Sequence, residues 1–305
     1  MSMRMRRAWH ALAMAWLLLW AGLATGAGPL FLWELRDAGG GLRAWLYGTI
    51  HVCDAACFPL PGKVREALGA ADSLALELDL ADPTVMQRLG EAALLPAGTR
   101  LDAQLPPALR PRLVLAATRM GLPPEAVQRL QPWMVGTLLT VRVAETVGFR
   151  TEQGVDLWLA GTAKAAGKPL WALETVDRQI AALSAGGEAA QLASLTEVIE
   201  LIESGGARAY FQRMLDAWHA GDAAALDQLL REEMSSTTMA PLFEEMFDRR
   251  NREMATSIVR YLEAGGRPFV AVGAGHFGGA SGLLAELAAR GYQLKQVVEP
   301  AHGLE

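Results

Sequence analysis

Hydrophobic and polar positions divide the chain into strand-like segments near both ends and a long helical stretch between them. Apolar runs at 31–36 and 42–47 flank the Gly-rich segment 37–41, a pattern that predicts a β-hairpin. At 73–80 leucine alternates with Ser, Ala, Glu and Asp, which predicts a strand with one apolar and one polar face. The other short strands are predicted at 170–173, 269–272 and 293–298.

Most of the remaining chain has the spacing of helices. One helix is predicted at 61–71, where a proline stands at the start, and another at 281–290. The stretches 84–168 and 175–262 are almost all helical, with breaks at prolines. Strands at the two ends of the chain must meet to bury their apolar faces. The sequence therefore predicts an α/β fold, with a central mixed sheet formed from N- and C-terminal strands and a large helical insertion.

The segment 1–27 has the pattern of a secretory signal peptide. A basic segment at 4–7 precedes an apolar run at 11–23, and small residues at 24–27 offer a cleavage site. A membrane anchor is the alternative, but the apolar run is shorter than the ~20 residues that a spanning helix needs. We therefore expect one mature domain at 28–305, periplasmic or secreted, with no stable transmembrane span.

The charge balance argues against a nucleic-acid partner. The 305-residue chain has a formal net charge of -5, and removal of the three leader arginines leaves 25 basic against 33 acidic residues, a net charge of -8. No basic cluster remains that would follow a phosphate backbone. The hydrophobic fraction of 51% is typical of a globular protein rather than a disordered one.

Two copies of one short pattern provide the candidate chemistry. Gly48-Thr49-Ile50-His51 and Gly273-Ala274-Gly275-His276 lie 225 residues apart, each directly after a predicted strand. A glycine allows a sharp turn where a strand ends, and a histidine three residues later is then presented at the mouth of the sheet. Either histidine alone could simply cap a turn. Two imidazoles at one sheet edge, as the predicted fold implies for His51 and His276, can hold a metal ion or move a proton.

Cys53 and Cys57 are the only cysteines, and they follow His51 closely. In an exported protein this spacing predicts a local disulfide that fixes the loop behind the histidine. One alternative is a metal cluster of His51, Cys53 and Cys57, although structural zinc sites usually show a second ligand pair, which the sequence lacks. Two free thiols are the third possibility, which an oxidising compartment disfavours.

Carboxylates and an arginine are candidate partners of the histidines. Glu77, on the alternating strand, can serve as a metal ligand or a general base, or can be a solvated carboxylate on an edge strand. Asp79 shares its face and could support the site from behind. Arg250 and Asn251 begin a predicted helix. Arg250 could stabilise an oxyanion or bind a substrate carboxylate, or could face water like its neighbouring arginines. The last candidates, which could instead cap helices, are Asp156 and Glu174.

Several motifs together give the chain a resemblance to the TraB/GumN family, and they run in the family's order from about residue 30 to 299. These motifs are Tyr47 to Val52, Phe58-Pro59-Leu60-Pro61, Leu76-Glu77-Leu78-Asp79, Gln131-Pro132-Trp133, Glu152 to Asp156, Leu173-Glu174-Thr175 with Gln179, Arg250-Asn251, and Val272 to Phe277 with Gly291-Tyr292. The family includes the Tiki-type metalloproteases and is similar in fold to the erythromycin esterase and ChaN-like proteins. The resemblance therefore implies a divalent-metal hydrolase. It does not fix the substrate, because the family also includes pheromone-shutdown and polysaccharide-related proteins without a settled reaction.

The sequence thus predicts a periplasmic or secreted, divalent-metal-dependent hydrolase of a peptidase-like kind, acting on a peptide or other small polar substrate. His51, His276 and Glu77 would hold a Mn²⁺, Co²⁺ or Zn²⁺ ion, and Arg250 would face the reaction. Two alternatives stay open: a non-catalytic periplasmic ligand- or peptide-binding protein, and an accessory to envelope polysaccharide assembly. No G-x-S-x-G, Walker or complete Rossmann motif occurs, so a serine nucleophile and a phosphate-binding loop are not indicated.

Overall fold

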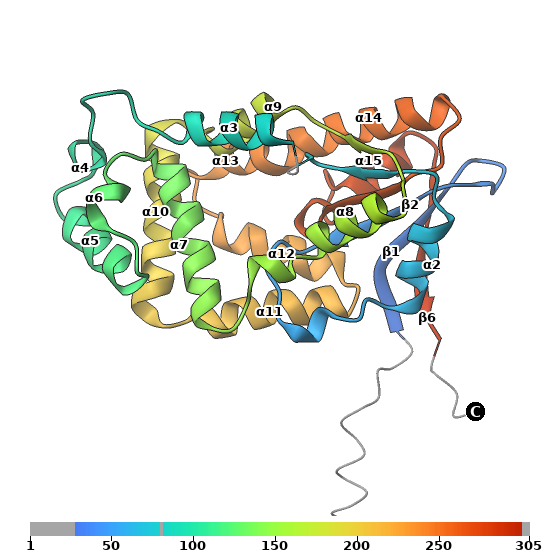
Figure 1. The fold of residues 1–305 in the computed structure, drawn as a ribbon, viewed down its shortest axis with the longest axis horizontal. Coiled ribbons are helices and arrows are strands. Elements are labelled where there is room, and N and C mark those ends of the chain that lie inside the picture. The colour runs from blue at the N-terminus through green and yellow to red at the C-terminus, as the bar shows by residue number, and fades with distance from the viewer. Residues whose placement is uncertain (1–27, 80–81, 301–305) are drawn as a thin grey trace, which may run out of the picture.

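The strands form a single sheet, shown with the rest of the chain in Figure 1. The computed structural model describes residues 28–79 and 82–300, so the predicted leader at 1–27 lies outside the described residues. The strands are β1 (Gly28–Arg36), β2 (Leu42–Thr49), β3 (Leu74–Leu76), β4 (Leu170–Ala172), β5 (Phe269–Gly273) and β6 (Gln293–Glu299). The predicted hairpin is confirmed, because β1 and β2 pair antiparallel across the Gly-rich turn.

The sheet is mixed, with the order β4-β3-β5-β2-β1-β6. β1 pairs antiparallel with β2 and with β6, whereas β5 pairs parallel with β2 on one side and with β3 on the other. The C-terminal strand β5 is therefore inserted between two strands from the N-terminal part of the chain. This confirms the predicted α/β fold, with a sheet built from both ends of the sequence.

The strand predicted at 73–80 is much shorter in the structure. β3 covers only Leu74–Leu76, all three of its residues are buried, and it lies between β4 and β5. The expectation of a two-faced strand was wrong, because a central parallel strand is covered on both faces and needs no polar side. Residue 80 lies outside the described residues. Glu77 follows the last residue of β3 directly, at the carboxyl end of the strand.

Helices make up most of the remaining structure. Those between β2 and β4 are α2 (Gly62–Ala70), α3 (Pro83–Ala92), α4 (Leu101–Gln104), α5 (Leu109–Arg119), α6 (Pro124–Val127), α7 (Pro132–Thr146) and α8 (Val155–Ala165). Those between β4 and β5 are α9 (Val176–Leu183), α10 (Gly187–Ser204), α11 (Ala207–His219), α12 (Ala223–Glu233), α13 (Ala240–Phe243) and α14 (Arg250–Glu263). α15 (Leu283–Ala289) precedes β6, and the short turns are η1 (Ala55–Cys57), η2 (Thr151–Gln153), the π-helical η3 (Glu244–Arg249) and η4 (Ala274–His276).

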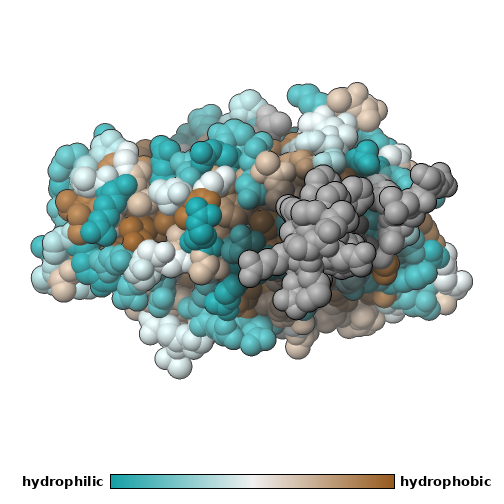
Figure 2. Space-filling view, turned by 90° about the horizontal axis from the view of Figure 1, so that it is seen from below, coloured by the Kyte–Doolittle hydropathy of each residue, from teal (hydrophilic) through white to brown (hydrophobic). Residues whose placement is uncertain are grey.

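The helical insertion lies beyond one end of the sheet, where α7 and α10 pack side by side and α5 lies against α10 (Figure 1). Seen from below, apolar surface gathers toward the left and middle of the molecule, among hydrophilic side chains (Figure 2). α14 and α15 pack against each other beside the sheet, and α8 contacts three of its strands. None of the helices in the described ranges is long and apolar enough to span a bilayer.

Candidate active site

The parallel pairing of β2 with β5 brings the two Gly-x-x-His segments together. Thr49 is opposite Gly273 in the register, so both strands end at the same edge of the sheet. A β-carbon built on Gly273 would lie 3.6 Å from Nε2 of His51 and 3.7 Å from Cδ2 of His276. It would also lie 3.1 Å from Oε1 of Glu77. The two histidines and the carboxylate that follows β3 therefore converge on one glycine, and their role as a site stays a prediction.

The glycines of these segments act through close packing rather than through unusual backbone angles. None of the glycines with positive φ in the described chain is Gly48, Gly273 or Gly275, so the chain leaves these strands without a left-handed backbone at the glycines. A β-carbon on Gly48 would lie 2.2 Å from the Phe31 ring, and one on Gly275 would lie 2.7 Å from a methyl group of Leu230. Their lack of a side chain lets neighbouring groups approach the strand ends.

Arg250 is the centre of the polar network. It is the first residue of α14, and only 5% of its side chain is exposed. Its Nε and Nη2 donate to the two oxygens of Glu174 at 3.0 and 2.6 Å, a bidentate pair. Nη2 also donates to Oε2 of Glu77 at 2.5 Å, and Nη1 donates to the Met246 carbonyl and to Nε2 of His276, each at 3.2 Å. The interpretation of Arg250 as a solvated surface charge is therefore wrong.

A signal in the sequence could have revealed that Arg250 points inward. Arg250 is in line with Met254, Ile258 and Leu262 at four-residue intervals, and all four are buried on one face of α14. The neighbouring Arg249 and Arg252 fall on the other face and are exposed. Arg250 was therefore recognisable as the polar end of an apolar helical stripe.

Glu77 is held as a carboxylate. Its Oε1 accepts a hydrogen bond of 2.7 Å from the Gly273 amide, and its Oε2 is bound by Arg250. Burial raises the pKa of Glu77, but the positive charge facing it and the Gly273 amide outweigh burial, and the pKa falls to about 2. Glu174 differs, because burial raises its pKa above the usual value despite Arg250. At neutral pH Glu77 is a poor proton acceptor and a good ligand for a cation.

His276 is a buried, neutral imidazole. Its side chain is 6% exposed, and burial together with the Arg250 charge lowers its pKa to about 3, although the Glu77 carboxylate opposes this shift. Nδ1 contacts Oδ1 of Asn251 at 2.7 Å. The ring also lies against Phe247, with 5.2 Å between the ring centroids. No sequence pattern predicted the contact of Phe247 with His276. Phe247 belongs to the π-helical turn η3, whose spacing differs from that of an α-helix.

His51 lies on the solvent-exposed side of the site, and 66% of its side chain is exposed. Its Nδ1 contacts Oδ2 of Asp156, the second residue of α8, at 3.2 Å. Burial lowers the pKa of His51, but the hydrogen bond and charge of Asp156, together with the charge of Glu77, raise it further, so the pKa lies above its usual value. The Val155 amide donates to the Ile50 carbonyl at 2.9 Å, which fixes the start of α8 next to the histidine segment.

A disulfide joins Cys53 to Cys57, as predicted. Its sulfurs are therefore not thiolates, which excludes the alternative cluster of His51, Cys53 and Cys57. The backbone of Cys53 forms a two-way bridge with Arg150, so the loop behind His51 is tied to the chain that leads into α8. Asp79 lies two residues beyond Glu77, and its carbonyl accepts a hydrogen bond from the Asp82 amide. A supporting role of its side chain remains a prediction.

The donors around Gly273 fit a divalent cation in kind. They are two imidazoles with Nδ1 already engaged, and an ionised carboxylate, a set that Zn²⁺, Mn²⁺ and Co²⁺ all accept. These ligand atoms lie farther apart than the ligands around a bound ion would. Among the described residues only Cys53, Asp54 and Cys57 bring three possible ligand atoms within 4.8 Å of one another. The Arg250 guanidinium binds Glu77 and Nε2 of His276, so a cation that used both donors would have to displace it.

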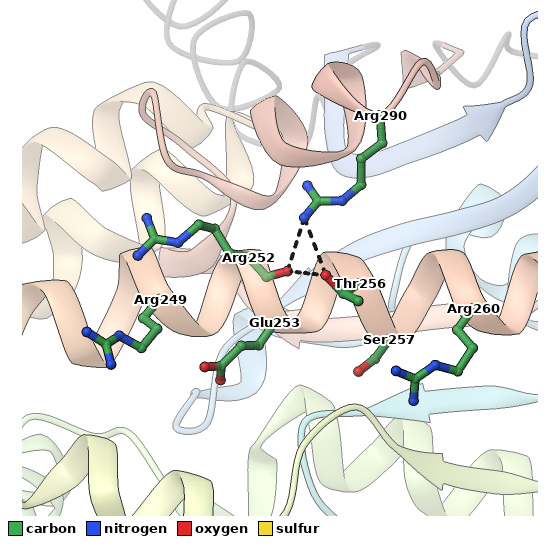
Figure 3. A pocket seen from close by; sticks show the side chains of 7 residues that line it. All are labelled: Arg249, Arg252, Glu253, Thr256, Ser257, Arg260 and Arg290. Carbon is green, nitrogen blue, oxygen red and sulfur yellow. Dashed lines mark hydrogen bonds between the residues drawn. The ribbon is translucent and has the colours of Figure 1, made fainter.

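A second, shallow pocket lies on the outer face of α14 and is separate from this site. Figure 3 shows its lining, which consists of Arg290 at the end of α15, Arg249 directly before α14, and five residues along α14: Arg252, Glu253, Thr256, Ser257 and Arg260. Arg249 pairs with Glu245 at 3.1 Å, and Arg290 pairs with Glu286 at 2.5 Å. The α14 side chains in this lining are exposed or half-buried, whereas Arg250 and Asn251, which contact His276, are buried. The pocket is therefore a mostly charge-balanced surface.

The chain is similar in sequence to several known proteins. Metalloprotease TIKI1 of Danio rerio is 24% identical over 321 aligned residues, which cover 89% of this chain and 64% of that protein. Metalloprotease TIKI2 of the same species is 25% identical, covering 87% of this chain and 60% of that protein. The uncharacterized protein YbaP of Escherichia coli (strain K12) is 29% identical over 167 residues, or 54% of this chain and 60% of that protein.

This chain thus spans about 60% of the length of the curated relatives that it matches. No solved structure matches it. The sequence pattern of the TraB/PrgY/gumN family matches residues 31–296, which include every strand from β2 to β5 and all the residues that converge on Gly273. The chain therefore belongs to the TraB/PrgY/gumN family.

Proposed function

We propose that this protein is an extracytoplasmic, metal-dependent hydrolase of a peptidase-like kind, whose ion is held by His51, His276 and Glu77. The observation that carries the proposal is the convergence of these three side chains, from three separate segments, on the space that a β-carbon of Gly273 would occupy. The relatives named metalloproteases align with most of the chain. The Cys53–Cys57 disulfide and the predicted leader support a compartment outside the cytoplasm.

A bound ion would supply a Lewis acid and a water of lowered pKa. The protein's part is to present the donors. Nδ1 of each histidine is engaged by a helix residue, which leaves Nε2 for the ion. Asp156, which engages His51, has its other oxygen buried and without a hydrogen-bond partner in the described chain, and that oxygen is suited to a water or a substrate N–H group.

Glu77 acts as a ligand rather than as the general base. A carboxylate with a pKa of about 2 holds a proton too weakly to take one from water efficiently near neutral pH. Both of its oxygens already accept hydrogen bonds, from Gly273 and Arg250, which orient it. The low pKa and the two hydrogen bonds support the role of ligand over that of base, a choice that the sequence left open.

Arg250 provides the positive charge for the developing oxyanion. Its bond to Nε2 of His276 is single, whereas its pairing with Glu174 is bidentate. If Nε2 of His276 and Glu77 held an ion, the guanidinium would give up these two contacts and would remain attached to Glu174. The released N–H group would then face the oxyanion. A lysine could not replace Arg250 equally well, because its ammonium lacks the fixed array of donors that binds Glu174 at the same time.

The test uses the mature protein isolated from the periplasm. Bound metal is measured by elemental mass spectrometry, and cleavage of a peptide library is followed with and without a chelator. The proposal predicts bound Zn²⁺, Mn²⁺ or Co²⁺ and chelator-sensitive cleavage. His51→Ala and His276→Ala should each remove the metal and leave the protein folded, whereas His219→Ala, an exposed histidine of α11, should change neither.

Full metal occupancy in either active-site variant would overturn the shared site. Metal binding without cleavage of any library member would instead favour the non-catalytic periplasmic binding protein. No observation in the structure favours the envelope-assembly alternative over these two.

A further inference from the structure

The side-chain amide of Asn251 has a defined orientation. Asn251 is the second residue of α14 and is 2% exposed. Its Nδ2 lies 2.9 Å from the backbone carbonyl of Ser281. A carbonyl oxygen only accepts hydrogen bonds, so the group that faces it must be the NH₂ group. The oxygen Oδ1 is then the atom that faces His276, at 2.7 Å from Nδ1.

This orientation determines which nitrogen of His276 carries the proton. The amide oxygen of Asn251 can only accept, so Nδ1 must carry the hydrogen and donate it. In a neutral ring Nε2 then has a free lone pair. Arg250, which has donors and no acceptor, faces that nitrogen at 3.2 Å. Arg250 therefore donates to His276, His276 donates to Asn251, and Asn251 donates to Ser281, so the three hydrogen bonds have the same direction.

The two histidines of the site are held in the same way by different groups. His51 contacts Asp156, the second residue of α8, and His276 contacts Asn251, the second residue of α14. The partner of the exposed ring is a carboxylate, and the partner of the buried ring is an uncharged amide. A carboxylate at 251 would place another negative charge among buried groups, which is costly unless it is paired.

We propose that Asn251 is a positioning residue that fixes His276 as the Nδ1–H tautomer and directs the Nε2 lone pair into the site. The Ser281 carbonyl sets the orientation of Asn251. The importance of this lone pair for a metal ion rests on the proposed function, but the tautomer itself is a property of the metal-free protein. A purely structural Asn251, which only ties α14 to the loop after η4, would not determine the proton position on His276.

The experiment is long-range ¹H–¹⁵N NMR of the histidine rings in the metal-free, full mature protein. The sequence has only five histidines, one of them in the predicted leader, so the signal of His276 can be assigned by comparison with a His276→Gln variant. We expect the Nδ1–H pattern in the wild type. A wild-type ring protonated on Nε2 would overturn the proposal whatever the variants do.

Two substitutions separate positioning from structure. Asn251→Leu keeps a similar volume and removes both hydrogen bonds, so His276 should lose its pure Nδ1–H pattern while the His219 signal stays unchanged. Asn251→Asp loses the bond to the Ser281 carbonyl and adds a buried charge, but an acceptor still faces Nδ1, so Nδ1 should stay protonated. A folded Asn251→Leu protein with an unchanged His276 tautomer would contradict the proposal. If Asn251→Leu does not fold, the proposal is tested by protonation of His276 Nδ1 in the wild type and in Asn251→Asp.

Affinity for Zn²⁺ provides a second readout. Loss of a histidine's outer partner typically weakens metal binding by about 10- to 100-fold, and Asn251→Leu should fall in that range. If the wild type binds no metal, the proposed function fails, while the tautomer measurement still decides the role of Asn251. If the wild type binds metal and Asn251→Leu binds it equally well, the positioning role fails and the proposed function stands.

Discussion

Arg250 and Glu174 form a buried bidentate ion pair, with 5% and 3% of their side chains exposed. Because Glu77 shares the same guanidinium, removal of Arg250 leaves two carboxylates without their common partner. Arg250→Gln should therefore destabilise the fold by about 3–5 kcal/mol, the usual cost of breaking a buried pair on one side. Urea unfolding measures this loss.

The double variant Arg250→Gln/Glu174→Gln should recover part of that stability, because one of the unpaired carboxylates is then neutral. The matched control is Arg260→Gln, an exposed arginine of the same helix without a carboxylate partner in the described chain, which should stay within about 0.5 kcal/mol of wild type. An Arg250→Gln protein as stable as this control would show that the network contributes little.

Stability should depend on pH through His276. Its pKa is about 3 in the folded protein, against an ordinary value of 6.5, so the unfolded chain takes up the proton first as the pH falls. The contribution of the neutral ring to stability is therefore fully present above pH 6.5 and is lost as the pH falls toward 3. The loss approaches about 1.4 kcal/mol for each pH unit.

The measurement compares metal-free wild type with His276→Gln between pH 7 and pH 5.5, above the range where carboxyl groups dominate. The wild type should lose stability more steeply. Two parallel curves would mean that the folded and unfolded states bind this proton equally.

Glu77→Gln should lower metal affinity and hydrolysis together. The neutral amide keeps the size of the side chain but cannot neutralise a cation, and it also weakens the contact with Arg250. Titration with Zn²⁺ and a rate assay on the same sample check this outcome. Glu66→Gln, an exposed carboxylate paired only with Lys63, is the control. Retention of metal with a loss of rate of about 10²- to 10⁴-fold would identify Glu77 as a base instead.

The two glycine segments should differ in their tolerance of a side chain. In Gly48→Ala the new methyl group would overlap the Phe31 ring at 2.2 Å and approach the Ala274 backbone at 3.1 Å, which leaves little room to adjust. In Gly275→Ala the nearest atom is the end of the Leu230 side chain at 2.7 Å. Thermal unfolding should show a cost at or above about 1–3 kcal/mol for Gly48→Ala and a smaller cost for Gly275→Ala. The reverse order would contradict this account of the packing.

The disulfide should act mainly on the position of His51. The loop between Cys53 and Cys57 is very short, so the stabilisation should lie near the low end of the range of about 2–4 kcal/mol. The variant Cys53→Ser/Cys57→Ser should therefore fold, with weaker binding of Zn²⁺ because the segment behind His51 is released. Alkylation of periplasmic wild-type protein under non-reducing conditions should find no free thiol. Two alkylated cysteines would refute the linkage.

The sheet and the pairing of the histidines were predictable, because both follow from apolar runs that end in the same short motif. The length of β3 was not predictable, since Leu76 is followed by Glu77 in an alternating pattern that continues past the end of the strand. Tertiary packing between β4 and β5 decided where pairing stops.

The partners of each histidine were harder to assign. Asp156 contacts His51 because the start of α8 docks on the Ile50 carbonyl, a contact between segments about a hundred positions apart that no local pattern encodes. Asn251 and Phe247 depend on the π-helical turn before α14, which shifts the phase of the helix. The sequence showed which residue types could take part in a site, whereas the contacts between their side chains depended on the fold.

The insertion of β5 between β2 and β3 has a consequence for the order of assembly. His51 and Glu77 belong to the first part of the described chain to be made, and His276 belongs to the last. β5 can pair with β2 and β3 only after the long segment between them has folded back. Contacts between residues so far apart in the sequence form slowly during folding. No N-terminal fragment that lacks β5 contains the site, so a chain interrupted before His276 lacks one of the three side chains that converge on Gly273.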